Sequence, residues 1–165
     1  MKVVAGVFDT NASANQALVD LLNNGFSKDD VSVLVTDEGH SRLFGNAEEE
    51  ANRAARGGLA GAAFGGALGA LIAGLTTVGL IVIPGANLLA VGPLVAALSG
   101  GGAGAAIGGL SGALISAGFA ADEARRYEEE IKRGNAVVVV HARDGQEAAK
   151  AHMLLLQSGA MIKAA

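Results

Sequence analysis

Apolar and polar residues alternate in blocks that predict a strand, a helix and a second strand within the first 35 residues. Residues 3–8 are an apolar, β-branched run, which is typical of a strand. The polar residues 9–11 follow as candidates for a helix N-cap. Gly25 suits the residue after a helix, and residues 31–35 form the next apolar run. The helix between them has its apolar residues at helical spacing, namely Ala14, Ala17, Leu18, Leu21 and Leu22.

The C-terminal end repeats this pattern. Residues 136–141 are a second β-branched run, Asp144 and Gly145 begin a helix, and Gly159 ends it. Residues 160–163 then predict a short edge strand. When the first half is shifted by 134 residues, three helix positions and the glycine after the helix coincide with identical residues of the second half. The matches are Ala17 with Ala151, Leu21 with Leu155, Leu22 with Leu156 and Gly25 with Gly159.

Two such halves predict an α+β fold of the split βαβ, or ferredoxin-like, type, with four strands and two helices on one face. Each half has about 30 residues, too few to bury a core alone, so the halves should fold against each other. We therefore expect residues 1–45 and 134–165 to form one domain, with residues 46–133 as an insertion.

The insertion contains a long uncharged segment. All 28 charged residues and all three histidines lie outside residues 57–121, and 18 Gly and 17 Ala fill 35 of those 65 positions. Asn46 with Glu49 marks a helix start, which predicts a helix that continues through residue 83. Pro84-Gly85 predicts a break, and an apolar loop to Pro93 precedes a returning helix over about residues 94–133. The insertion is thus predicted to be a helical hairpin.

Glycine recurs every fourth residue in each arm of this hairpin. Such a line of small residues lets two helices approach closely, as in the small-xxx-small motif. We interpret the two lines as a glycine zipper that mediates helix packing. Its residues are Gly57, Gly61, Gly65 and Gly69 in the first arm and Gly100, Gly104, Gly108 and Gly112 in the second.

The hairpin has a length and flanking charge that favour a membrane. The 27 residues 57–83 would span about 40 Å as a helix, against a hydrocarbon core of about 30 Å. Arg53 and Arg56 precede the segment and Arg125 and Arg126 follow it, which predicts both ends in the cytoplasm. Two alternatives stay open: a soluble homo-oligomeric assembly or shell that buries the hairpins, and a passive pore.

Composition excludes several classes of protein and indicates no reaction. The chain has no cysteine and 12 basic against 16 acidic residues, which argues against disulfide-stapled modules and nucleic-acid binders. His40, His141 and His152 are too scattered for a metal site, and Glu48–Glu50 and Glu128–Glu130 are expected on solvated helix faces. We therefore expect a non-enzymatic protein with no cofactor, metal or small-molecule substrate, whose partners are its own copies and membrane lipid.

Four stretches resemble one known family. VVAGVFDT (3–10), NNGFSKDDVSVLV (23–35), IVIPG (81–85) and ADEARRYEEEIKRGNAVVVV (121–140) are similar to the bacterial general stress proteins, also called heat- or low-temperature-induced proteins. The resemblance implies a stress-linked protein with a Gly/Ala-rich insert and no catalytic residues. Members commonly have proline where this chain has Ala120, so the returning helix is expected to run unbroken into Tyr127 and Ile131.

Overall fold

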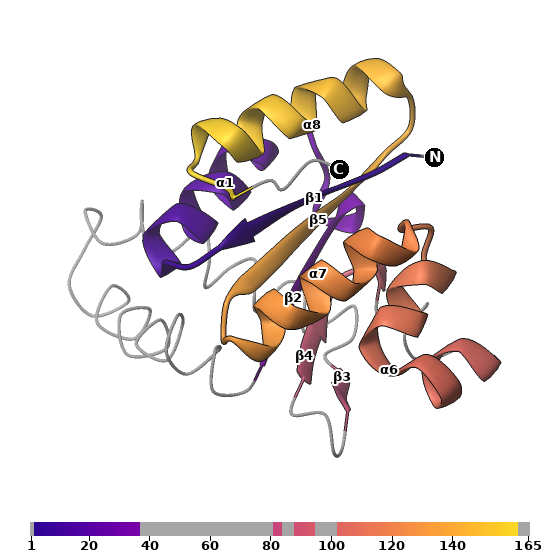
Figure 1. Ribbon diagram of the computed structural model, residues 1–165. Coiled ribbons are helices and arrows are strands. Elements are labelled where there is room, and N and C mark those ends of the chain that lie inside the picture. The colour runs from indigo at the N-terminus through magenta and orange to yellow at the C-terminus, as the bar shows by residue number, and fades with distance from the viewer. Residues whose placement is uncertain (1, 37–80, 84–87, 95–101, 162–165) are drawn as a thin grey trace.

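The computed structural model describes residues 2–36, 81–83, 88–94 and 102–161, and these form a sheet with helices on both faces (Figure 1). The strands are β1 (Lys2–Phe8), β2 (Val31–Thr36), β3 (Ile81–Ile83), β4 (Leu88–Val91) and β5 (Ala136–Ala142). The helices are α1 (Asn11–Asn23), the short 3₁₀ helix η1 (Lys28–Asp30), α6 (Gly102–Ser116), α7 (Ala121–Lys132) and α8 (Gly145–Gln157). The mixed α+β class predicted from the sequence is confirmed.

The sheet has the strand order β1-β5-β2-β4-β3, and every neighbouring pair is antiparallel. β5 separates β1 from β2, with Gly6 opposite Val138 on one side and Val33 opposite Val138 on the other. β1 and β2 are therefore parallel to each other with one strand between them, which is the arrangement of a split βαβ unit. The two terminal halves of the chain thus meet at β5.

Helices α1 and α8 cover one face of the sheet, where they bury Leu21, Leu155, Phe8 and alternate valines of β5. The predicted ends of these two helices are confirmed. The Thr10 hydroxyl accepts the Ser13 N–H (3.3 Å) at the start of α1, and the Asp144 carboxylate accepts two N–H groups at the start of α8. Gly25 and Gly159 follow these helices at φ 94° and 87°, a conformation that favours glycine.

Helices α6 and α7 cover the opposite face of the sheet (Figure 1). Ala124, Tyr127 and Ile131 of α7 are buried on this face together with Leu114 of α6. These three positions form the apolar stripe of α7. Ala120 is exposed and precedes the helix.

The insertion adds strands to the sheet. β3 and β4 form a hairpin beside β2, so the predicted helix is wrong for residues 81–83 and the predicted loop is wrong for residues 88–91. The chain then crosses the start of β2, where the buried Ser32 hydroxyl accepts the Leu94 N–H (3.0 Å). Gly92 permits this crossing because a Cβ there would lie 2.3 Å from the Val31 carbonyl oxygen.

The predicted unbroken helix through residue 120 is also wrong. α6 ends at Ser116 and α7 starts at Ala121, with Gly118 between them at φ 105°. A glycine in this left-handed conformation ends α6 and reverses the chain. The break therefore forms without the proline that related proteins commonly have where this chain has Ala120. The two helices consequently pack side by side over the sheet.

The predicted C-terminal edge strand is present as a single bridge. Val7 and Met161 exchange two backbone hydrogen bonds, of 2.8 and 3.4 Å, at the outer edge of β1. The last residues of that prediction, 162 and 163, lie outside the described residues, as do the predicted helix start at Asn46 and the break at Pro84-Gly85.

Candidate functional site

Three glycines of the predicted zipper lie in α6, namely Gly104, Gly108 and Gly112. The other five, Gly57, Gly61, Gly65, Gly69 and Gly100, lie outside the residues that the structure describes. Gly112 is half-buried, and its carbonyl accepts the hydroxyl hydrogen of Ser116 (3.0 Å), the next small residue of the same line.

The line is not continuous along one helix, because α6 is kinked at Gly109. This residue has φ 58° and ψ −144°, angles that only glycine adopts readily. The kink separates Gly104 and Gly108 from Gly112. The expectation that the second line follows one straight helix face is therefore wrong, and the reason is the second glycine of the Gly108-Gly109 pair.

Glu128 of α7 holds the helical segment that follows the kink. Its Oε2 accepts the backbone N–H of Ser111 (3.1 Å), and its Oε1 lies 2.7 Å from the Lys132 ammonium. Burial alone would raise the pKa of Glu128, but the hydrogen bonds from Lys132 and Ser111 outweigh it and lower the pKa below its ordinary value. The carboxylate thus acts as an N-terminal cap from a neighbouring helix.

Three ion pairs along α7 join residues that are four positions apart. Asp122 pairs with Arg126 at 2.9 Å, Glu128 with Lys132 at 2.7 Å and Glu129 with Arg133 at 3.9 Å. The prediction that all three residues of the Glu128–Glu130 run lie on a solvated face is wrong for Glu130. Its carboxylate is buried against Arg133 (2.6 Å) and the Asn135 amide (2.8 Å), so it closes the end of the helix.

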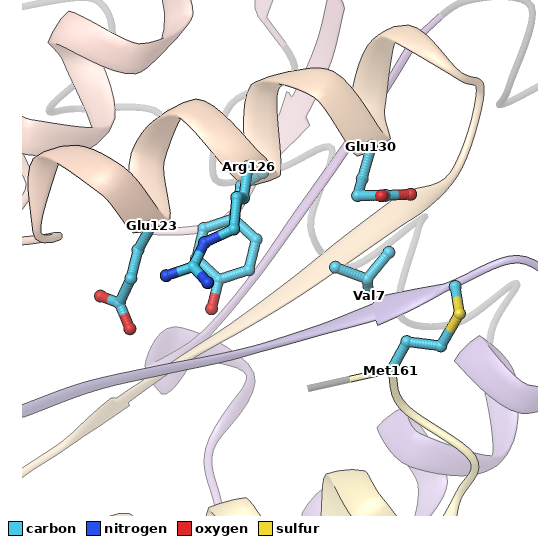
Figure 2. Close-up of a pocket in the computed structure, with 6 residues that line it drawn as sticks. Val7, Glu123, Arg126, Glu130 and Met161 are labelled. Carbon is cyan, nitrogen blue, oxygen red and sulfur yellow. The ribbon is translucent and has the colours of Figure 1, made fainter. Parts of the chain in front are cut away.

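A pocket lies between α7 and the end of β1, with a cavity volume of about 40 Å³. Figure 2 shows Glu123, Arg126 and Glu130 projecting from the side of α7 that faces β1, with Glu130 directed toward Val7; Met161 also lines the pocket. Tyr127 completes the lining. The volume is sufficient for a few water molecules or one compact ligand.

The phenol of Tyr127 is buried and neutral. The ring is 7% exposed and packs edge-to-face on Phe119, with ring centroids 5.5 Å apart. Burial raises the pKa of Tyr127, the Glu123 carboxylate raises it further, and the Arg126 guanidinium opposes this shift. Nothing in the sequence joined Tyr127 to residues 7 and 161.

The two described histidines do not converge. His141 is on β5, and burial lowers its pKa while nearby Asp30 opposes the shift. Its Nδ1 is buried without a hydrogen-bond partner in the described part of the chain. His152 is on α8, whereas His40 lies outside the described residues. Among the described residues, no three His, Cys, Asp or Glu side chains group as a metal site would require.

Comparison with known families adds a biological context to this geometry. Residues 3–82 match the model of the heat-induced stress protein YflT domain. The first half of the chain is thus similar to a heat-induced stress protein domain. This match confirms the resemblance to bacterial general stress proteins, and it begins with β1 and ends within β3. No curated protein and no solved structure matches the chain significantly.

The described helices of this chain are all too short or too polar to span a membrane. Residues 57–80 make up most of the segment that was predicted to insert, and they lie outside the described residues.

Proposed function

We propose that this chain is a non-enzymatic, stress-associated protein that self-assembles through its uncharged segment, residues 57–121. The YflT family match supports the stress association. The observation that carries the self-assembly is the absence of any charged residue over 65 consecutive positions, 35 of them Gly or Ala. In the proposed mechanism, the α+β domain holds the segment at both ends while glycine faces of different copies pack together.

The surface of α6 supports this proposal. The helix has no charged residue, yet Ile115 is 44% exposed and Gly109 and Ser116 are exposed as well. Gly112 and Ser116 are spaced as a small-xxx-small pair beside Ile115. An apolar surface with small residues matches the packing face of another helix, and a second copy of this chain offers the same surface.

The energetics of glycine point in the same direction. Residues 57–83 contain eight glycines, and each would cost about 0.8–1 kcal/mol relative to alanine in a helix interior. The sum, roughly 6–8 kcal/mol, requires compensation by close packing if these residues form a helix. Assembly with other copies supplies that packing.

We further propose that the assembly resides in the cytoplasmic membrane with the α+β domain in the cytoplasm. Eight Leu, Ile, Val and Phe residues between positions 57 and 80, outside β3, favour insertion by roughly 2–5 kcal/mol in total. The arginines at positions 53, 56, 125 and 126 flank the segment on both sides, consistent with the positive-inside rule.

The test of self-assembly is the double substitution Gly65→Leu with Gly104→Leu. We expect light scattering to report a smaller species, because each leucine holds neighbouring helices apart. The matched control is Gly66→Leu with Gly101→Leu, which makes the same change one or three residues off the lines and should keep the parent size. Far-UV circular dichroism verifies that the α+β domain folds in both. An unchanged oligomer in the first variant contradicts the proposal.

Membrane insertion is tested separately by washing membranes with alkaline carbonate. Retention of the protein in the pellet supports insertion. Complete release to the supernatant contradicts insertion and favours the soluble assembly or shell. A solute-flux assay in liposomes tests the passive pore.

A further inference from the structure

The pocket between α7 and β1 presents two opposite charges that do not pair with each other. Glu123 and Arg126 both line it, three residues apart on α7. Arg126 pairs instead with Asp122, through one Nη2–Oδ2 contact of 2.9 Å. Glu123 has no ion-pair partner within the part of the chain that the structure describes.

Each of the two charged groups has hydrogen-bonding capacity left for a ligand. Arg126 has five N–H donors on a planar fork, and the contact with Asp122 occupies one of them while it restrains the guanidinium. A carboxylate such as that of Glu123 accepts several hydrogen bonds. Neither side chain is fully buried, so both can be reached from solvent.

The rest of the pocket is apolar or already neutralised. Val7 and the Met161 side chain lie opposite α7 (Figure 2). Glu130, at the far end, has its carboxylate bound by Arg133 at 2.6 Å and by the Asn135 amide at 2.8 Å. Tyr127 adds a neutral phenol. The charges that remain for a ligand are therefore one carboxylate and one guanidinium, over a small apolar floor.

We propose that this pocket binds a compact zwitterion, a small molecule with one carboxylate and one ammonium group, of the amino-acid or betaine type. The ligand carboxylate accepts hydrogen bonds from Arg126, and its ammonium group lies against Glu123. A short apolar body contacts Val7 and Met161. A molecule with a single charge fits less well, because an ammonium group alone meets the guanidinium and a carboxylate alone meets Glu123.

The size of the pocket sets the size of the ligand. The enclosed space of about 40 Å³ takes only a few atoms of a ligand, so the rest of a bound zwitterion lies in the open mouth of the pocket. Ligands of so few atoms bind weakly, so we expect dissociation constants of about 1 mM. This inference is independent of the self-assembly proposed above, because all its residues belong to α7, β1 and the C-terminal bridge.

The test is a chemical-shift titration of the full chain with four probes. L-alanine and glycine betaine are the two zwitterions, and they separate a primary ammonium group from a quaternary one. Propylammonium and propionate each carry one of the two charges. We expect saturable shifts at Val7, Tyr127 and Met161 with at least one zwitterion, and binding at least about tenfold weaker for both single-charge probes. Equal or tighter binding of either single-charge probe overturns the proposal, as does the absence of saturable binding by both zwitterions.

Two variants and two matched controls assign the contacts. Glu123→Gln and Arg126→Gln should each weaken zwitterion binding at least about tenfold, because each removes a charge-assisted hydrogen bond. Glu129→Gln and Arg125→Gln make the same changes at residues of α7 outside the pocket, and they should leave binding unchanged. If controls and pocket variants bind alike, the site is wrong. Circular dichroism of all four variants verifies that the helices form.

Discussion

Gly109 has a backbone conformation that no other residue type adopts at low cost. With φ 58° and ψ −144°, it allows α6 to change direction above Glu128. The space around it is open, since a Cβ would meet its nearest neighbour, Glu128 Oε1, at 4.0 Å. Any penalty at this position therefore arises from the backbone and not from a clash.

We predict that Gly109→Ala destabilises the protein by about 1–3 kcal/mol in urea unfolding, the usual cost of a strained backbone conformation. Gly145→Ala is the matched control. Gly145 begins α8 without positive φ, and a Cβ there would lie 3.7 Å from Lys2 Nζ, an ordinary contact. The control should be neutral or more stable by up to about 1 kcal/mol. Equal effects of the two substitutions would show that the kink is absent.

His141 makes stability depend on pH at mildly acidic values. Its Nδ1 is buried without a partner in the described structure, and burial lowers the pKa of the folded imidazole below the ordinary value of 6.5, against the opposing effect of Asp30. The unfolded chain therefore binds more protons than the folded chain in this range. The contribution of His141 to stability is complete above about pH 6.5 and is lost as the pH falls through the lower pKa of the folded state.

We predict that the free energy of unfolding of the parent falls between about pH 7.5 and pH 5 by more than that of His141→Gln. Glutamine keeps a polar side chain that does not titrate. Unfolding of both proteins at about pH 8 provides the reference, because the imidazole is neutral there in both states. A parallel pH dependence of the two proteins would contradict the assignment.

At the scale of elements, α6 and α7 are joined by a charged cap as well as by apolar packing. Glu128 accepts the Ser111 N–H at 3.1 Å and keeps 18% exposure of its side chain. The bond connects two helices, so it determines how the segment after Gly109 sits on α7. Loss of the carboxylate should loosen α6 and leave the sheet intact.

We predict that Glu128→Ala destabilises the chain by about 1–2 kcal/mol and speeds hydrogen exchange at the Ser111 amide. Glu129→Ala is the control, since Glu129 is on the same helix with 66% side-chain exposure and a 3.9 Å ion pair. An exposed pair of that kind contributes little, so we expect a change within about 0.5 kcal/mol. Unaltered exchange at Ser111 in Glu128→Ala would exclude the cap.

Local signals explain which elements the sequence predicted. Thr10 and Asp144 cap their helices, and Gly25 and Gly159 end them, because capping depends on residues within one turn. The short run Ile81–Ile83 is ambiguous, since three apolar residues fit a strand or a buried helix equally. The positive φ angles of Gly109 and Gly118 could not be predicted, because glycine is common throughout this region and most of its positions look alike in the sequence.

At the scale of the whole molecule, the pairing of distant segments was only partly predictable. The matching halves indicated that β1, β2 and β5 share a sheet, because neither half can bury its apolar face alone. The pocket could not be predicted, since Val7, Met161 and α7 are brought together by tertiary packing and share no sequence pattern.

The position of β5 between β1 and β2 also determines when the domain can form during synthesis. Its first residue, Ala136, follows the last residue of β2, Thr36, by 100 residues. At translation rates of about 5–20 residues per second, the ribosome needs roughly 5–20 s to make this stretch. The uncharged segment thus leaves the ribosome before the central strand exists, with no folded domain yet beside it. A nascent chain of this kind offers its apolar segment to a membrane or a chaperone first, and completes its sheet last.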